Sequence, residues 1–170
     1  MENVHRRFGK DAEFFNLGWL VASIFPGNYL YTLPKIGQAK NVVWEGTDLK
    51  GRRWIDTIPR HLLSRDPNNS ERKLYFTSGS MLHVTGADSL MGAHLGSNLR
   101  GLFMSEFQRT NPSIWDYLRP IIKRNPDGFA CFNYTSFGKG HAYKLFEANK
   151  DKPNWHCRKL TVNDTRDNDG

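Results

Sequence analysis

The first candidate for chemistry is a pair of polar residues at the end of an apolar run. Residues 101–107 read Gly-Leu-Phe-Met-Ser-Glu-Phe, so Ser105 and Glu106 follow three apolar residues. Such a run is typical of a strand buried on both faces in a parallel sheet, where chemistry collects at the carboxyl ends of the strands. A carboxylate there can hold Mg²⁺, directly or through water, or orient a water molecule for attack. Many buried strands also end in an acid, so a purely structural Glu106 remains open from this stretch alone.

A second candidate is a Gly-Lys pair that precedes an expected helix. Residues 12–24 have apolar side chains at helical spacing, at Phe14, Leu17, Val21 and Ile24. The start of such a helix favours phosphate, and Lys10 would add a positive charge for the β- and γ-phosphates of a nucleotide. The match to the pattern G-x-x-x-x-G-K-[ST] is partial, because Val4 stands at the first glycine position and Asp11 at the Ser/Thr position. The alternative is a charged helix start at which Asp11 complements the helix dipole.

These candidates need a sheet and helices to position them, and the hydrophobic pattern predicts both. Strands are expected at 29–33, 101–104, 129–132 and 155–162, and helices at 12–24, 36–45, 112–122 and 140–149. A hairpin is expected over 73–84, with a two-residue turn at Ser78-Gly79. Strands that alternate with helices predict an α/β domain with a mostly parallel central sheet flanked by helices.

Length and composition narrow the class of protein. The chain has 170 residues, of which 24% are charged and 13% aromatic, as in one globular domain rather than a disordered chain. No apolar run approaches the roughly 18 residues that a membrane helix needs, and the start has no secretory apolar region. The formal net charge of +7 is spread along the chain, which favours a polyanionic partner without identifying one.

Taken together, these segments resemble the P-loop NTPase-like ATPase domain of the large terminase subunits of tailed phages, the motors that package DNA into capsids. Residues 5–11 are similar to the variant Walker A loop of that family, in which arginines precede Gly-Lys and Asp can replace Ser/Thr. Residues 27–44 are similar to the strand and helix that come next. Residues 86–106 resemble the approach to Walker B, and residues 112–120 the helix after it. Residues 133–141 resemble the coupling motif, usually written S-T-P-x-G.

For the phosphate loop, the resemblance implies that Gly9, Lys10 and Asp11 bind ATP. Arg7 or Arg6 would act in cis as a finger that stabilises charge developing on the γ-phosphate. The alternative for the two arginines is contact with a DNA backbone or a surface salt bridge.

For the strand ends, the resemblance implies that Glu106 orients the attacking water. Ser105 and Asp11 would hold Mg²⁺, directly or through water. Thr135 and Gly138 belong to the coupling motif, in which Thr135 would sense the γ-phosphate and pass the signal to elements that grip DNA. A capped turn is the structural alternative for Thr135.

The resemblance also implies cofactors and partners. The cofactors would be ATP and Mg²⁺. The partners would be double-stranded DNA, the terminase small subunit, the portal protein and further copies of the chain in a ring, with no membrane. The chain would act in the host cytoplasm, docked transiently on the procapsid, and would not be secreted.

The sequence departs from the family pattern in several places. Residues 1–165 would form the ATPase domain, incomplete at the N-terminus, because residues 1–4 are too few for a full strand and no adenine-binding segment precedes them. Residues 166–170 read as a polar tail or the start of a linker, with the nuclease domain absent. Ser105 stands where many relatives carry the Walker B Asp, and Ser136 where the coupling motif has Pro.

Two other functions therefore remain open. The chain could be a degenerate or split-gene fragment that binds DNA or a motor partner without ATP turnover. It could also be a helicase-like ATPase, since those enzymes share the phosphate loop and the acid at a strand end. The Asp-Glu-x-Asp/His signature of helicases does not follow Met104, which disfavours the second alternative.

Overall fold

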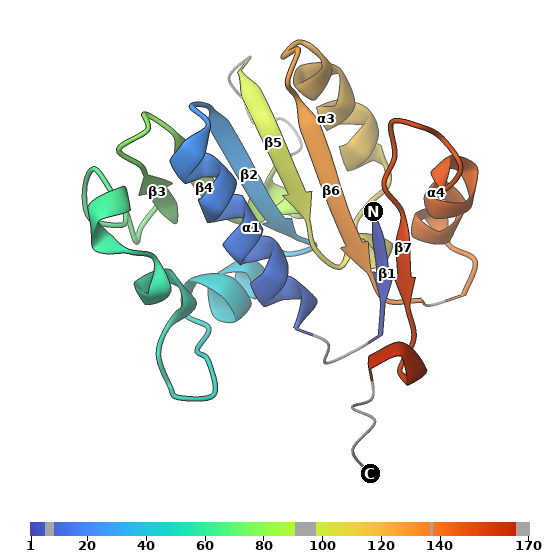
Figure 1. Cartoon of the computed structure of the whole chain (residues 1–170), viewed down its shortest axis with the longest axis horizontal. Helices are drawn as coiled ribbons and strands as arrows, with labels where there is room; N and C mark the ends of the chain where they lie inside the picture. Colours follow the sequence, from blue (N-terminus) through green and yellow to red (C-terminus); the bar gives the residue numbers. More distant parts are fainter. Residues whose placement is uncertain (6–8, 91–97, 137, 166–170) are drawn as a thin grey trace.

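The computed structural model describes residues 1–5, 9–90, 98–136 and 138–165. Among these residues, seven strands form one sheet in the order β3-β4-β2-β5-β6-β1-β7 (Figure 1). The strands are β1 (Glu2–Val4), β2 (Asn28–Leu33), β3 (Lys73–Tyr75), β4 (Met81–Gly86), β5 (Leu99–Met104), β6 (Phe129–Tyr134) and β7 (Arg158–Leu160). All their pairings are parallel except that of β3 with β4. The predicted α/β fold with a mostly parallel sheet is confirmed.

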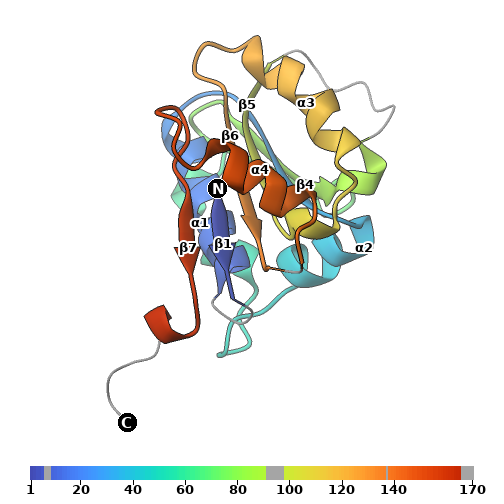
Figure 2. The ribbon, with the colours of Figure 1, turned by 90° about the vertical axis from the view of Figure 1, so that its right-hand side faces the viewer.

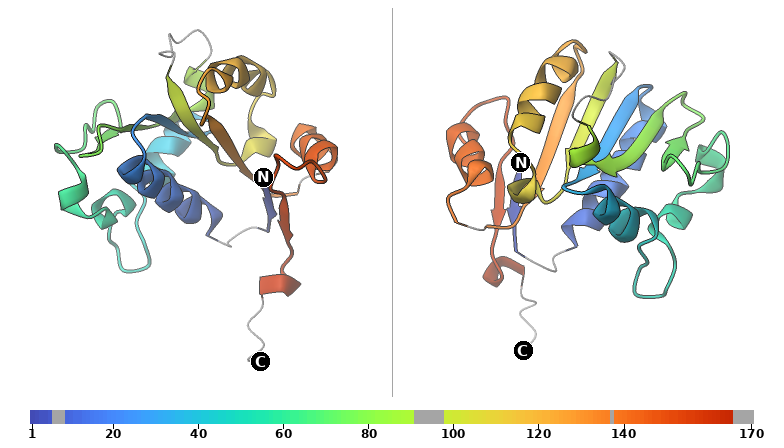
Figure 3. Two further views of the ribbon diagram at one scale, coloured as in Figure 1. Left: turned by 45° about the horizontal axis from the view of Figure 1, so that its top comes forward. Right: turned by 180° about the vertical axis from the view of Figure 1, so that it is seen from behind.

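Helices cover both faces of this sheet. Figure 2 shows α1 (Lys10–Ile24) on one side and α3 (Ser113–Lys123) on the other, and the rear view in Figure 3 shows α3 and α4 (His141–Asn149) in front of the strands. The short α2 (Ile36–Gln38) continues into a π-helix. The π-helix spans Ala39–Trp44, and 3₁₀ turns lie at Trp54–Thr57, Arg60–Leu62, Ala87–Ser89, Phe107–Arg109 and Asn163–Thr165. The four predicted helices are therefore present, the second of them partly as a π-helix.

Helix α1 is present as predicted, but only part of its apolar series is buried, with Phe14 inside at 4% exposure. Phe15 and Gly18 are buried, whereas Leu17 and Ile24 are 40% and 57% exposed. Gly18 packs over the sheet, where a Cβ would lie 3.6 Å from the Phe103 ring. The bulky Phe15 and the small Gly18 therefore turn toward the sheet together, and this rotation leaves Leu17 outside.

The core consists of two clusters, one on each face of the sheet, and the strands alternate between them. On β5, Phe103 packs in the cluster under α1, while Leu102 and Met104 pack in the cluster under α3 and α4. Side chains along a strand point to opposite faces in turn. Ser105 therefore follows Phe103 to the α1 face, and this alternation decides which residues meet at the strand end.

Two expected strands differ in detail. The hairpin is confirmed, but its loop has three residues, because Phe76 N–H donates to the Ser80 carbonyl at 2.9 Å. Gly79 occupies the last loop position with φ of +88°, a left-handed conformation that favours glycine and closes three-residue hairpins. Strand β7 is shorter than the predicted 155–162 because it pairs with β1, which has three residues.

Three further expectations concern the ends of the chain and membranes. Strand β1 is short, as expected, yet it pairs on both sides, with β6 and with β7. The predicted polar tail at 166–170 lies outside the described residues, and the domain bounds stay a prediction. Within the described part of the chain, no helix has the length and apolar character needed to cross a membrane.

Candidate functional site

The sheet order brings three strand ends together at one edge, the lower edge in Figure 1. Strand β6 lies between β1 and β5, and all three run in parallel. Met104 pairs with Phe132, and Glu2 pairs with Asn133. Ser105 is therefore level with Asn133, directly beside the strand that leads to the predicted phosphate loop.

The start of α1 has features that suit a phosphate group. Gly9 caps the helix with φ of +88° and ψ of 13°, and a Cβ at this glycine would meet nothing within 4 Å. Lys10 is the first helical residue and is 7% exposed, with Nζ 3.8 Å from Asp11 Oδ2. The first N–H groups of a helix have no partner within the helix, and the positive end of its dipole attracts anions. The arrangement therefore suits a phosphate group.

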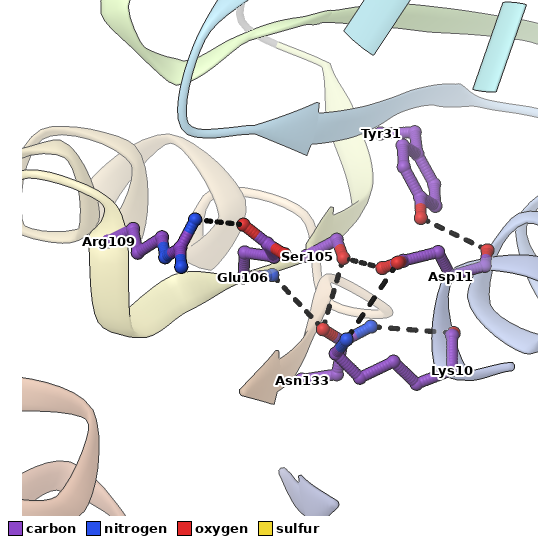
Figure 4. Close-up of polar contacts among 7 residues, drawn as sticks. All are labelled: Lys10, Asp11, Tyr31, Ser105, Glu106, Arg109 and Asn133. Carbon is purple, nitrogen blue, oxygen red and sulfur yellow. Dashed lines mark hydrogen bonds and ion pairs between the residues drawn. The ribbon is translucent and has the colours of Figure 1, made fainter. Parts of the chain in front are cut away.

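A hydrogen-bonded cluster joins this helix start to the end of β5 (Figure 4). Ser105 Oγ donates to Asp11 Oδ1 and lies 3.1 Å from Asn133 Oδ1, with one proton to share between the two acceptors. Glu106 N–H donates to Asn133 Oδ1 at 3.1 Å, and Asn133 Nδ2 donates to the Lys10 carbonyl at 3.4 Å. Ser105 and Asn133 are both fully buried. The amide of Asn133 thus connects α1, β5 and β6.

Tyr31 supports the cluster from β2. Its hydroxyl donates to the Asp11 carbonyl at 3.1 Å. Burial raises the pKa of Tyr31 well above its usual value, and the negative charge of Asp11 raises it further. Tyr31 therefore stays neutral and keeps the proton with which it holds the first turn of α1.

Glu106 points away from this cluster. Figure 4 shows its carboxylate turned toward Arg109, whose Nη1 lies 3.6 Å from Glu106 Oε2. The chain leaves the extended conformation of β5 at this point, so the direction of Glu106 is set by the turn that follows the strand. Glu106 has φ of +50° and ψ of 41°, a left-handed conformation two residues past the end of β5 and directly before the 3₁₀ turn at Phe107–Arg109. In this conformation the predicted water-orienting carboxylate does not face Lys10.

A cavity of about 590 Å³ lies beyond Glu106 at the same edge of the sheet. Arg109 lines it together with the Lys35–Asp88 ion pair, whose charged atoms are 3.9 Å apart. His141 also lines it, with Nε2 2.7 Å from the Phe107 carbonyl oxygen. Lys10 and Ser105 do not line this cavity. Lys10, Glu106 and Thr135 thus lie at one edge of the sheet, and none of the three lines this cavity.

The remaining predicted residues lie near the hydrogen-bonded cluster or outside the residues that the structure describes. Thr135 is partly buried just past β6, two residues beyond Asn133, and Gly138 is exposed with φ of +65°. Ser136 Oγ donates to Asn3 Oδ1 at 2.8 Å, which ties the coupling segment to β1. Arg6 and Arg7 lie outside the described residues, and their predicted role stays a prediction.

Comparisons with known proteins identify the fold. No protein-family model matches the sequence, and no curated protein matches it. The solved large terminase of a thermophilic bacteriophage superposes with a TM-score of 0.71 at 18% identity, over 96% of this chain. Its complex with ADP gives 0.66 at 16% identity, and the ATPase domain of the Thermus phage P74-26 large terminase gives 0.58 at 19% identity, over 86% of this chain. The fold is that of a phage large-terminase ATPase domain.

The predicted resemblance to terminases is thus confirmed at the level of the fold. This chain spans 40% of the terminase from the thermophilic bacteriophage and 62% of the P74-26 ATPase domain. The former terminase has been solved with ADP and with ATP-gamma-S, so that protein binds adenine nucleotides.

Asn133 is the residue of the candidate site whose role the sequence did not reveal. It begins the stretch that resembles the coupling motif, yet that motif gives no role to its side chain. One signal was available, because Asn133 follows the apolar run 129–132 much as Ser105 follows its own apolar run. Two polar residues at the ends of neighbouring parallel strands are expected to meet. The sequence did not show that β6 lies between β1 and β5.

The oxygen atoms of the candidate site fit a magnesium ion. A carboxylate from Asp11 and a hydroxyl from Ser105 are hard oxygen ligands of the kind Mg²⁺ prefers. In the described part of the chain, no group of three or more His, Cys, Asp or Glu side chains is placed to hold a metal. Mg²⁺ commonly takes one or two carboxylates and completes its shell with phosphate and water. Asp11 and Ser105 would therefore hold the ion together with a nucleotide.

Proposed function

We propose that this chain is an ATP-binding and ATP-hydrolysing motor domain of the large-terminase type, which drives double-stranded DNA into a procapsid. The observation that carries the proposal is the cluster in which Asn133 and Ser105 hold Lys10 and Asp11 against the end of β5. This cluster joins the start of α1, which suits phosphate, to the end of β5. Asn133 at the end of β6 makes the connection. The terminase fold supports the same function.

Each residue of the site would have its own role in this reaction. Lys10 would bind the β- and γ-phosphates, and bound Mg²⁺ would neutralise charge on the same phosphates. Asn133 would keep the helix start and the strand end at a fixed distance. Glu106 would orient the attacking water, for which its side chain has to turn from Arg109 toward Lys10.

Further roles follow from the family resemblance. Arg7 or Arg6 would stabilise charge on the γ-phosphate, a contribution of about 10³–10⁵ in rate in related NTPases. Thr135 and Gly138 would couple nucleotide state to DNA. Double-stranded DNA, the terminase small subunit and the portal protein would be the partners, with copies of the chain in a ring on the procapsid in the host cytoplasm. The net charge of +7 supports a polyanionic partner.

The test separates binding from turnover. Binding of fluorescent ATP and release of phosphate would be measured for the parent, Lys10→Ala and Glu106→Gln. Lys10→Ala should weaken ATP binding by roughly tenfold or more, because it removes a charge that contacts phosphate in the ground state. Glu106→Gln should keep ATP binding and lose about 10²–10⁴ in rate, because an amide accepts a proton poorly.

Lys35→Ala is the matched control, since Lys35 is a lysine at the same sheet edge that pairs with Asp88. It should leave both ATP binding and turnover close to those of the parent. A parent chain that binds no ATP would show that the terminase likeness stops at the fold. Turnover by Glu106→Gln at the parent rate would make Glu106 structural.

A second candidate function is binding of DNA or a motor partner without ATP turnover. The ion pair between Glu106 and Arg109 favours it, because this pair holds the predicted carboxylate away from Lys10. The same measurements separate the two functions. A chain that binds ATP without releasing phosphate, whether or not Glu106 is replaced, would support this second candidate.

A further inference from the structure

Asp11 and Ser105 stand in each other's usual places. In the phosphate-loop pattern the residue after Gly-Lys is Ser or Thr, whose hydroxyl binds Mg²⁺. The second ligand is the Asp at the end of the Walker B strand. This chain has the carboxylate at position 11 and the hydroxyl at position 105. Ser105 Oγ donates a hydrogen bond to Asp11 Oδ1. The pair therefore keeps one carboxylate and one hydroxyl in contact, with their positions reversed.

We infer that Asp11 and Ser105 form a magnesium site in which the two ligand types are exchanged, with the charge carried by α1 and the neutral oxygen by β5. The inference rests on the proposed function, because the nucleotide phosphates supply the other ligands. The site then has the single negative charge of the usual pair. The carboxylate of Asp11 makes up for the missing carboxylate at position 105, and the hydroxyl of Ser105 makes up for the missing hydroxyl at position 11.

Burial and charge explain why the exchange has to involve both residues. Ser105 is fully buried, while the Asp11 side chain is 21% exposed at the positive end of the α1 dipole. Before the ion binds, a carboxylate at both positions would place two negative charges in contact in a buried place, which is costly. A hydroxyl at both positions would leave no charge for the metal.

The experiment measures metal binding and does not depend on turnover. Mn²⁺ is the probe, and the free ion is followed by electron paramagnetic resonance in the presence of ATP-gamma-S. Asp11→Ser should weaken Mn²⁺ binding by at least the roughly 10- to 100-fold that loss of a metal-site partner costs. Adding Ser105→Asp to that variant should restore most of the lost affinity, because the carboxylate returns at the other position.

Two further variants keep the result interpretable. Asp11→Asn keeps the shape of the side chain and should weaken Mn²⁺ binding as Asp11→Ser does, even if the double variant folds poorly. Glu13→Ser removes another carboxylate from the first turn of α1, one that pairs with Arg158 at 3.1 Å. Glu13→Ser should leave the Mn²⁺ affinity unchanged, so an effect of the helix dipole alone is excluded.

The outcomes distinguish this inference from the proposed function. Unchanged Mn²⁺ affinity in both Asp11 variants, or a folded double variant that binds no better than Asp11→Ser, would overturn the exchanged site while nucleotide binding still stands. A parent chain that fails to bind ATP-gamma-S would overturn the proposed function, and the exchanged site with it.

Discussion

The two sides of the β5 end are built in opposite ways. The loop side consists of Lys10, Asp11, Ser105 and Asn133, and the cavity side consists of Glu106, Arg109 and the cavity beyond them. On the loop side, hydrogen bonds join three elements, and two of the residues are fully buried. On the cavity side, the Arg109 side chain is 53% exposed, and its contact with Glu106 is a 3.6 Å ion pair.

This difference suggests which side is fixed and which can move. Rearranging a buried polar network leaves donors and acceptors unpartnered, which costs roughly 1–3 kcal/mol per group. An exposed ion pair contributes only about 0–1 kcal/mol. The loop side is therefore suited to binding and positioning, and the cavity side to a change of side-chain direction during the reaction.

The largest expected effect comes from breaking the loop side at Asn133. Asn133→Ala removes the acceptor for Glu106 N–H and the donor to the Lys10 carbonyl, both in a buried place. The free energy of unfolding should fall by roughly 2–4 kcal/mol, and affinity for ATP should fall as well because the start of α1 loses its anchor. Urea unfolding and fluorescent ATP binding measure the two effects.

Asn149 offers a matched control for this substitution. It is 8% exposed, and its Nδ2 donates to the Leu145 carbonyl at 2.7 Å within α4. Asn149→Ala should cost less stability and leave ATP affinity unchanged. If Asn133→Ala behaved like Asn149→Ala in both assays, the loop side would not depend on the Asn133 amide.

The contrast between the two sides also shows what the sequence could predict. The apolar run before Ser105 and the Gly-Lys pair at Lys10 predicted a strand end and a helix start, and both lie at one sheet edge. These are local patterns that hydrophobic spacing and capping describe well. The likeness to terminases came from the order of such patterns along the chain.

What the sequence could not predict depends on contacts between distant segments. The central role of Asn133 follows from the place of β6 between β1 and β5, which pairing decides. The direction of Glu106 follows from the turn after β5 and from its ion pair with Arg109. The exposed Leu17 reflects the close packing of Gly18 on the sheet. Each of these depends on packing rather than on local propensity.

An effect of intermediate size on stability is expected from His83, which lies on β4 and belongs to neither the loop side nor the cavity side. Burial lowers the pKa of His83 to about 4, and the charges of Lys73 and Arg72 lower it further. The unfolded chain binds a proton at His83 near pH 6.5, whereas the folded chain does so only near pH 4. Stability should therefore fall as the pH drops from 6.5 to 4, by roughly 1–2 kcal/mol after allowance for solvent screening.

His83→Gln sharpens the comparison because it removes this acid-sensitive group and leaves the site intact. Unfolding of the parent and of His83→Gln would be followed at several pH values between 4 and 7. The difference in unfolding free energy between the two should change over this range. Parallel curves would mean that His83 does not bind its proton differently in the folded and unfolded chains.

The smallest expected effect comes from breaking the cavity side at Arg109. Arg109→Met removes the cation that holds Glu106 but keeps much of the apolar length of the side chain. Because the Arg109 side chain is 53% exposed and the pair is 3.6 Å long, the free energy of unfolding should change by less than about 1 kcal/mol. The same energy limits the gain in the population of Glu106 that faces Lys10, so turnover at saturating ATP should rise about two- to fivefold.

Arg109→Lys is the control, since an ammonium group can still pair with Glu106, and its turnover should stay near that of the parent. Combining Arg109→Met with Glu106→Gln should abolish the gain, because the gain depends on the freed carboxylate. A fall in turnover for Arg109→Met, with stability unchanged, would contradict this account. It would mean that Arg109 takes part in the reaction and that the ion pair with Glu106 belongs to the working state of the cavity side.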